Sequence, residues 1–322
     1  MDNNQSYQIL LAEIQKSFSK KSVMVDTLAD ILRIEKGAVY RRLRKEVPFT
    51  FNEIVIIAKK LNISLDRLVG IKGQKTVPYQ LGLPDYISPQ EEDYHIFNNY
   101  LRFLRLVSQM ENSETACVSN LLTMDFISGF YNLARFYLFE WNFHYHNDKI
   151  KPFHHISILP KIGKFLTETA MEMRKFSKNQ YIFDSKVVKY FINDVNYFYN
   201  IRLIEKEDVL KIKEDLFSML DYLEDMAITG QFKETGKSVS LYVSDIEITT
   251  SYIYVEAKNI YYSFVRTFVL SYFTSTDENT FEKTKKWINS IIKISTLITL
   301  TNERQRVLFF ENQRKFVNEL CP

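Results

Sequence analysis

Basic side chains are concentrated in one short stretch of the chain, between residues 33 and 45. The stretch contains a single acidic residue, Glu35, among Arg33, Lys36, Arg41, Arg42, Arg44 and Lys45. Arginine can hydrogen-bond bidentately to the edge of guanine, and both arginine and lysine bind phosphate oxygens. The chemistry that these residues suggest is nucleic-acid recognition. The basic excess is local, because the whole chain has 42 basic and 39 acidic residues and a formal net charge of only +3.

Histidines form the second group of residues that could do chemistry. Four of the five histidines lie within a short segment, and they are His144, His146, His154 and His155. Neutral imidazoles are common ligands of zinc, and a mononuclear site needs three or four ligands. The spacing matches no familiar metal motif, however, and Lys149 and Lys151 lie among the histidines. We therefore interpret the segment as a polar loop, with a metal site as the alternative, and we expect no cofactor.

Motifs for catalysis and nucleotide binding are absent from the sequence. It contains no glycine-rich phosphate loop, no G-x-S-x-G and no H-E-x-x-H motif. The two cysteines, Cys117 and Cys321, are far apart and belong to no metal-binding or redox pattern. Glu224 and Asp225 are adjacent, so on a helix they point to different sides. We expect that the protein is not an enzyme.

Helical periodicity surrounds the basic stretch. The spacing of apolar residues predicts one helix over residues 6–18 and a second that begins at a cap formed by Asp26 or Thr27. After a turn at Arg33, a third short helix is expected over residues 36–44, and Pro48 prevents it from continuing far. The basic side chains would then lie mainly on this third helix.

Two further helices are expected before residue 71. Thr50 followed by Glu53 is a capping-box pattern for a fourth helix that extends to Leu61. Ser64 would cap a short fifth helix that ends at Gly70. The sequence thus predicts a domain of five short helices over residues 1–70.

These helices resemble the DNA-binding domain of the lambda-repressor-like family, also called the Cro or xenobiotic-response-element family. The residues that carry the resemblance are Leu28, Ala29, Leu32, Ile34 and Val39, together with the segment IAKKLNISLDRLVG. The chain departs from the family at Arg33, where Gly or Asn is common, and at Leu43 and Lys45, where an acid and Gly are common. The resemblance implies a helix-turn-helix domain that binds double-stranded DNA.

A helical projection of residues 36–45 predicts which side chains would face the DNA. At about 100° per residue, Val39 and Leu43 share the core side, whereas Gly37, Arg41, Arg44 and Lys45 point away from it. Tyr40 and Arg42 lie on the flanks. In this motif the second helix of the pair enters the major groove. The alternative, a merely solvated face, would normally carry both signs of charge.

Each candidate on this face has an expected role. Arg41 and Arg44 would read bases, and Gly37 would let the backbone approach closely. Lys36, Arg42 and Lys45 would bind phosphates, and Tyr40 would pack on a sugar or a thymine methyl group.

Prolines and glycines mark a linker over residues 71–90, which separates this domain from a larger one over residues 91–322. Ser88 and Pro89 predict the start of a long helix that extends to about Glu111. Its apolar stripe contains Phe97, Leu101, Leu104 and Val107. We expect the stripe to pack on its own domain, with a dimer helix as the alternative.

The remaining segments predict a helical body with a small sheet. Helices are expected over residues 129–145, 159–176, 184–202, 205–229, 276–293 and 303–320. Residues 116–126 could be a strand or a loop, residues 181–183 a short strand, and three antiparallel strands are expected in the segment after Lys237. The expected fold class is mainly α, with an α+β C-terminal domain that is mostly helical and contains a small antiparallel sheet.

These features together predict a bacterial-type, sequence-specific transcriptional regulator. It would bind double-stranded DNA as a homodimer held together by the C-terminal domain, where a small-molecule or protein effector could also bind. The aromatic residues of that domain would form its core or line a pocket for an apolar or ring-containing ligand. No signal-peptide pattern or long apolar run occurs, so we expect a cytoplasmic protein without membrane contact. The alternative function is a protein-interaction module of the antitoxin-like or adaptor type.

Overall fold

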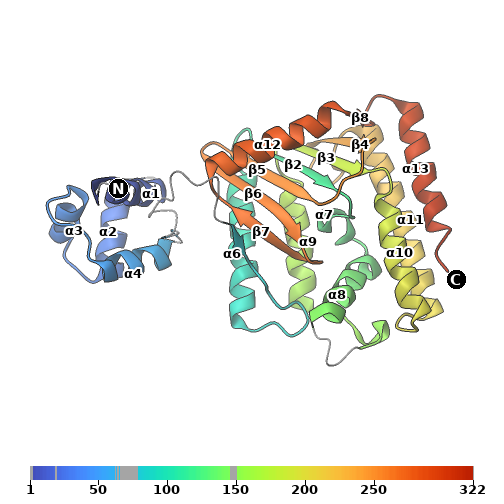
Figure 1. Cartoon of the computed structure of the whole chain (residues 1–322), viewed down its shortest axis with the longest axis horizontal. Helices are drawn as coiled ribbons and strands as arrows, with labels where there is room; N and C mark the ends of the chain where they lie inside the picture. Colours follow the sequence, from blue (N-terminus) through green and yellow to red (C-terminus); the bar gives the residue numbers. More distant parts are fainter. Residues whose placement is uncertain are drawn as a thin grey trace. The chain divides into compact units, whose positions relative to one another are not determined.

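The structure is a computed structural model that describes residues 3–18, 20–61, 63, 65, 79–145 and 151–321. The chain divides into two compact units, Met1–Pro78 and Tyr79–Pro322, which we call unit 1 and unit 2. Figure 1 shows both units, with labels on most of their helices and strands. Within the described ranges, no helix is long and apolar enough to cross a membrane.

Unit 1 is built from short helices around one apolar core. They are α1 (Asn3–Lys16), α2 (Lys21–Leu32), α3 (Lys36–Leu43) and α4 (Phe51–Leu61). Their apolar faces meet at side chains that include Ile14, Leu28, Val39 and Ile57, all of them fully buried. The expected fifth helix falls almost entirely outside the described residues.

Capping patterns in the sequence predicted where two of these helices begin. Thr50 and Glu53 form the expected capping box, since the Glu53 N–H donates to Thr50 Oγ1 at 3.3 Å and the Thr50 N–H donates to Glu53 Oε2 at 2.8 Å. In contrast, α2 begins at Lys21 and not at the expected cap. The reason is that Met24 and Val25 are buried in the core, so the preceding turn is drawn into the helix.

Unit 2 is organised around an eight-stranded sheet. Its strands are β1 (Gln80–Leu81), β2 (Glu114–Ser119), β3 (Lys178–Asp184), β4 (Ser238–Ser244), β5 (Tyr252–Ala257), β6 (Ile260–Thr267), β7 (Ser271–Ser275) and β8 (Ser295–Leu297). The order is β1-β7-β6-β5-β2-β3-β4-β8. The three strands β2, β3 and β4 are parallel, with Cys117 opposite Tyr181 and Tyr181 opposite Leu241, whereas the other pairs are antiparallel.

Helices cover both faces of this sheet (Figure 1). The helices are α6 (Glu91–Ser108), α7 (Met124–Ile127), α8 (Tyr131–Tyr145), α9 (Pro160–Met173), α10 (Val187–Asn200), α11 (Lys206–Thr229), α12 (Glu278–Lys293) and α13 (Glu303–Val317), with a 3-10 turn at Phe153–His155. One face packs on α12, where Phe281 and Ile288 meet Val118 and Ile182. Side chains on the opposite face, such as Tyr181 and Leu241, enter the large core built with α7–α11 and α13.

The expected small antiparallel sheet is wrong, because the sheet is large and mixed and the fold is therefore α/β. Residues 116–119 and 179–184 lie in central strands that are buried on both faces. Such strands lack the polar alternation by which a half-buried strand is recognised. The segment after Lys237 was expected to pair only with its neighbours, but β4 pairs in parallel with β3, whose position in the chain is distant.

Two other expectations concern the start of unit 2. Residues 79–90 were assigned to the linker, but β1 pairs with β7 and Tyr86 is buried, so unit 2 begins before residue 91. The α6 stripe of Phe97, Leu101, Leu104 and Val107 is buried within unit 2. The stripe therefore packs on its own domain, as expected, and is not free to form a dimer helix.

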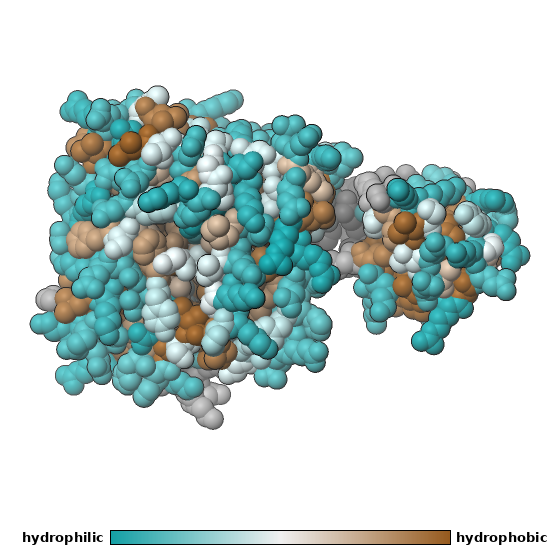
Figure 2. Space-filling model, turned by 180° about the vertical axis from the view of Figure 1, so that it is seen from behind, coloured by the Kyte–Doolittle hydropathy of each residue, from teal (hydrophilic) through white to brown (hydrophobic). Residues whose placement is uncertain are grey.

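Large exposed apolar side chains of unit 2 are distributed over several elements, including Leu106 on α6, Trp287 on α12 and Leu308 on α13. On the face drawn in Figure 2, apolar residues form separate patches between hydrophilic ones. Hydrophobicity on that face therefore does not single out one broad contact surface.

Candidate nucleic-acid interface

Helix α3 is fixed in unit 1 by one side and exposed on the other. Only Arg33, Ile34 and Glu35 separate it from α2. Val39 is fully buried and Leu43 packs against the core, as the helical projection predicted. The side chains on the remaining surface are exposed, and they are Lys36, Tyr40, Arg41, Arg44 and Lys45, with Gly37 among them. Six of the seven predicted DNA-contacting residues are thus exposed, on α3 or directly after it.

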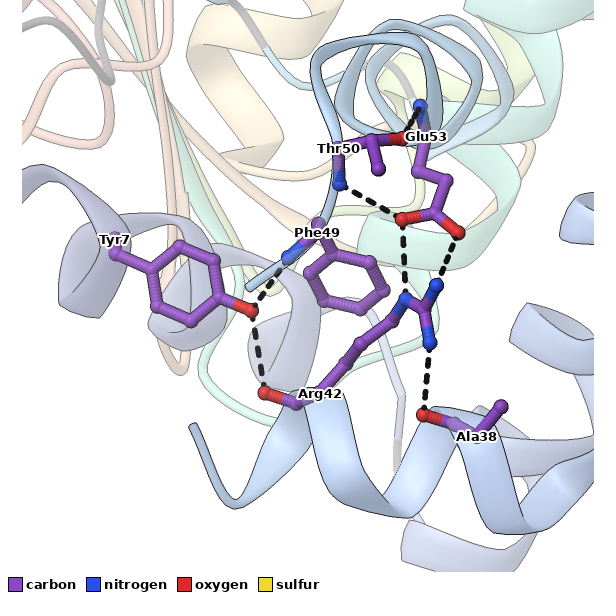
Figure 3. Close-up of polar contacts among 6 residues, drawn as sticks. All are labelled: Tyr7, Ala38, Arg42, Phe49, Thr50 and Glu53. Atoms are coloured by element: carbon purple, nitrogen blue, oxygen red, sulfur yellow. Dashed lines mark hydrogen bonds and ion pairs between the residues drawn. The ribbon is translucent and has the colours of Figure 1, made fainter. Parts of the chain in front are cut away.

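Arg42 is the exception, because its guanidinium group points to α4. Its Nη2 lies 2.7 Å from Glu53 Oε1 and its Nε donates to Glu53 Oε2 at 3.0 Å, while Nη1 donates to the Ala38 carbonyl at 3.3 Å (Figure 3). Both charged side chains are only 15% exposed. The expected phosphate contact of Arg42 therefore does not fit the structure, since Glu53 and the Ala38 carbonyl hold its half-buried guanidinium group against unit 1.

Glu53 and Tyr7 complete this internal network. Burial alone would raise the pKa of Glu53, but the hydrogen bonds from Arg42 and Thr50 outweigh it and hold the pKa below its ordinary value. The Tyr7 hydroxyl donates to the Arg42 carbonyl at 3.2 Å and accepts from the Phe49 N–H at 3.0 Å (Figure 3). The end of α3 is thereby tied to α1 and to the start of α4. The sequence showed the capping pair but gave no sign of its link to Arg42.

Acidic neighbours modify the charge of the exposed face. Lys36 Nζ lies 2.7 Å from Asp26 Oδ1, and Arg44 Nη1 lies 3.6 Å from Glu46 Oε1. The two basic side chains are 65% and 68% exposed, so water and salt screen both ion pairs and they contribute little to stability. Within the described part of unit 1, Arg41 and Lys45 form no ion pair. The face is therefore basic, but less uniformly so than the sequence suggested.

Two basic residues next to α3 adopt left-handed backbone conformations that favour glycine. Arg33 has a φ of 54° after α2, and Lys45 has a φ of 65° after α3. At each position the following N–H closes the helix end, from Ile34 to the Ala29 carbonyl at 3.1 Å and from Glu46 to the Arg41 carbonyl at 2.9 Å. A non-glycine residue costs about 1–2 kcal/mol there. Both side chains are exposed, so Arg33 joins the candidates although the helical projection did not include it.

At Gly37, in contrast, glycine is present although the packing of unit 1 does not require it. A Cβ atom added at Gly37 would meet nothing within 4 Å. Glycine lowers the stability of a helix interior by roughly 1 kcal/mol relative to alanine. Packing within unit 1 therefore does not require glycine at this exposed position.

The histidine segment does not assemble a metal site within the described residues. His144 lies at the end of α8, and His146 falls outside the described ranges. The rings of His154 and His155 contact each other with centroids 4.1 Å apart, and His154 Nδ1 lies 3.5 Å from Glu205 Oε1. His144, His154 and His155 are all exposed, which fits a polar surface.

No family model, curated protein or solved structure matches this chain. Functional assignment therefore rests on the residues and geometry of the protein itself.

Proposed function

We propose that the protein is a sequence-specific transcriptional regulator whose α3 enters the major groove of double-stranded DNA. The observation that carries the proposal is the exposed basic face of α3, where Arg41, Arg44 and Lys45 point away from the buried Val39. Two helices joined by a three- or four-residue turn form the helix-turn-helix motif, and the turn between α2 and α3 has this length. Membership of the lambda-repressor-like family is part of the proposal.

Each exposed side chain has a proposed role that follows from its chemistry. Arg41 and Arg44 bond to base edges, because the guanidinium group matches guanine bidentately. Lys36 and Lys45 bind phosphates, and Tyr40 packs on a sugar or a thymine methyl group. Gly37 permits a close approach of the backbone. Phosphates can replace Asp26 and Glu46 as partners of the basic side chains, because those ion pairs are largely exposed.

Two copies of the chain would bind paired half-sites in this proposal. A single helix-turn-helix contacts few bases, and dimers multiply those contacts over half-sites about 34 Å apart. We assign the dimer contact to unit 2 and the site of action to the cytoplasm. Sedimentation of the full chain with and without a two-half-site duplex measures the stoichiometry, for which we expect two chains per duplex.

The test of DNA recognition begins with enrichment of a random duplex pool by the full chain. On the enriched site, Arg41→Ala and Arg44→Ala should each weaken binding by about 1–3 kcal/mol and relax the base preference. Lys45→Ala should weaken binding to all sequences alike and reduce the slope of log affinity against log salt by about 1. Arg304→Ala, which removes an exposed arginine of unit 2, is the matched control and should leave affinity unchanged.

If Arg41→Ala and Arg44→Ala both left the affinity for DNA unchanged, α3 would not be the recognition helix. Failure to enrich any duplex at moderate salt would favour the second candidate, a protein-interaction module of the antitoxin-like or adaptor type. One observation favours that candidate. The acids Asp26 and Glu46 give the face a mixture of charges that also suits a protein partner.

A further inference from the structure

Unit 2 contains a cavity of about 350 Å³ between its sheet and helices α6 and α9. Strands β5, β6 and β7 form one wall, and residues 80–84 form part of another. The volume lies within the range of roughly 300–1,000 Å³ that is usual for small-molecule sites. All of its described lining residues belong to unit 2.

Aromatic rings and a single carboxyl group characterise the lining. The rings are Tyr86, Phe97, Tyr100, Phe165, Phe264 and Tyr272. Asp125 is the one ionisable carboxyl group, and neither lysine, arginine nor histidine occurs among the described lining residues. The cavity is thus mostly apolar, with aromatic and aliphatic side chains and one acidic group.

Polar atoms of the lining are only partly satisfied by the protein. The Thr169 and Ser271 hydroxyls are buried and have no hydrogen-bond partner among the described residues. Asp125 Oδ2 accepts a hydrogen bond from the Tyr181 hydroxyl at 3.1 Å, and the backbone N–H of Asp125 also donates to its carboxyl group. Burial raises the pKa of Asp125, although Tyr181 and Arg174 act in the opposite direction. These groups leave room for additional hydrogen bonds from a bound molecule.

Two arginines lie near the cavity but are used elsewhere. Arg174 Nη1 lies 2.7 Å from Glu234 Oε1, and its Nη2 donates to the backbone carbonyl of Asp125 at 2.8 Å. The Arg266 guanidinium donates to the carbonyls of Val269 and Leu122. Neither arginine lines the cavity. Within the described structure the Asp125 carboxyl group forms no ion pair, although the charge of Arg174 is close enough to lower its pKa.

We propose that this cavity binds a small organic ammonium ion with an apolar body, whose cationic nitrogen lies against Asp125 and the tyrosine rings. Aromatic faces attract cations, and enclosures of aromatic rings are a common means of recognising ammonium groups. A carboxylate adds a charge-assisted hydrogen bond. An anionic ligand would be repelled by Asp125 and would meet no basic lining group. This site does not depend on DNA binding by unit 1.

The test compares three ligands with one carbon skeleton, phenylbutylamine, phenylbutanol and phenylbutyrate, by calorimetric titration of the full chain without DNA at neutral pH. We expect the amine to bind about tenfold more tightly than the alcohol, and the carboxylate to bind most weakly. Asp125→Asn should reduce amine affinity by about tenfold and leave alcohol affinity nearly unchanged, because asparagine keeps the shape and an acceptor for Tyr181.

A second pair of variants tests the location of the site. Ile96 lies at the cavity and is 42% exposed, so Ile96→Trp should obstruct binding without disturbing the core. Leu106→Trp is the matched control, because Leu106 lies on the same helix, is exposed and does not line the cavity. The proposal is overturned if no ligand binds at millimolar concentration, if the alcohol equals the amine, or if Asp125→Asn lowers both equally. Loss of DNA binding would not affect these outcomes.

Discussion

At the scale of single residues, Lys45 is expected to lower the stability of unit 1 and to strengthen the proposed binding to DNA. It occupies a left-handed position where glycine is favoured, yet it presents an exposed positive charge beside α3. We predict that Lys45→Gly raises the free energy of unfolding of unit 1 by about 1 kcal/mol, because the backbone strain is relieved. On the proposed function, the same change should weaken DNA binding, since the proposed phosphate contact of Lys45 would be lost. Chemical denaturation followed by circular dichroism, together with a DNA titration, measures both effects.

Lys45→Ala separates the two contributions. Alanine removes the charge but keeps a side chain in the left-handed conformation, so DNA affinity should fall as far as in Lys45→Gly without the gain in stability. If both variants bound DNA like the original protein, Lys45 would have no role in recognition. If Lys45→Gly were less stable than Lys45→Ala, the strain assigned to this turn would be wrong.

At the scale of secondary-structure elements, the Arg42–Glu53 pair connects α3 to α4. We predict that Glu53→Gln lowers the free energy of unfolding of unit 1 by about 2 kcal/mol at neutral pH, because charge-assisted hydrogen bonds to Arg42 and Thr50 are weakened. Glu46→Gln is the control, since the Arg44–Glu46 pair is exposed and should contribute less than about 1 kcal/mol.

The contribution of Glu53 should depend on pH in a defined direction. Its pKa in the folded protein lies below the ordinary value of 4.5, so its stabilising effect is fully present above that value and is lost as pH falls through the lower, folded-state pKa. The difference in unfolding free energy between the original protein and Glu53→Gln should therefore shrink toward acid pH. A difference that stayed constant from neutral pH into the acid range would contradict this assignment.

At the scale of the whole molecule, the two units have separate cores and should unfold separately. Both tryptophans, Trp141 and Trp287, belong to unit 2, so tryptophan fluorescence reports that unit alone. We predict that Leu28→Ala, which truncates a fully buried side chain of unit 1, destabilises that unit by about 2–5 kcal/mol. In circular dichroism the unfolding transition of unit 1 should occur earlier, whereas the fluorescence transition of unit 2 should not move.

Ile288→Ala provides the reciprocal comparison, because Ile288 is fully buried between α12 and the sheet of unit 2. It should shift the fluorescence transition of unit 2 and leave the dichroism transition of unit 1 in place. Parallel shifts of both transitions in either variant would mean that the two units unfold as one cooperative body.

Features that depend on residues close together in the chain were predicted correctly, whereas features that depend on distant residues were not. Thr50 and Glu53 are three residues apart, and their capping box is present as expected. The buried side of α3 was also correct, because a helix fixes the relation between Val39 and Leu43. The DNA contacts stay predictions. The inward turn of Arg42 was missed, since its partner lies on another helix and depends on how α3 and α4 pack.

The sheet illustrates the same limit at larger separation. Residues 181–183 were expected to be a strand and lie within β3, but no local pattern indicates that β3 pairs in parallel with both β2 and β4. Buried parallel strands carry little polar alternation, and their partners are separated from them by whole helices. The α/β class therefore became visible only in the tertiary structure.

The sequence by itself determined helices α1, α3 and α4 of unit 1, the exposed basic side of α3 and most helices of unit 2, because these features depend on neighbours within a few residues. Tertiary structure decided that Arg42 belongs to Glu53, that the sheet is mixed, and that Asp125 faces an aromatic cavity. The physical reason is that these features join segments far apart in the chain. Their contacts arise from the packing of whole elements, which local periodicity does not specify.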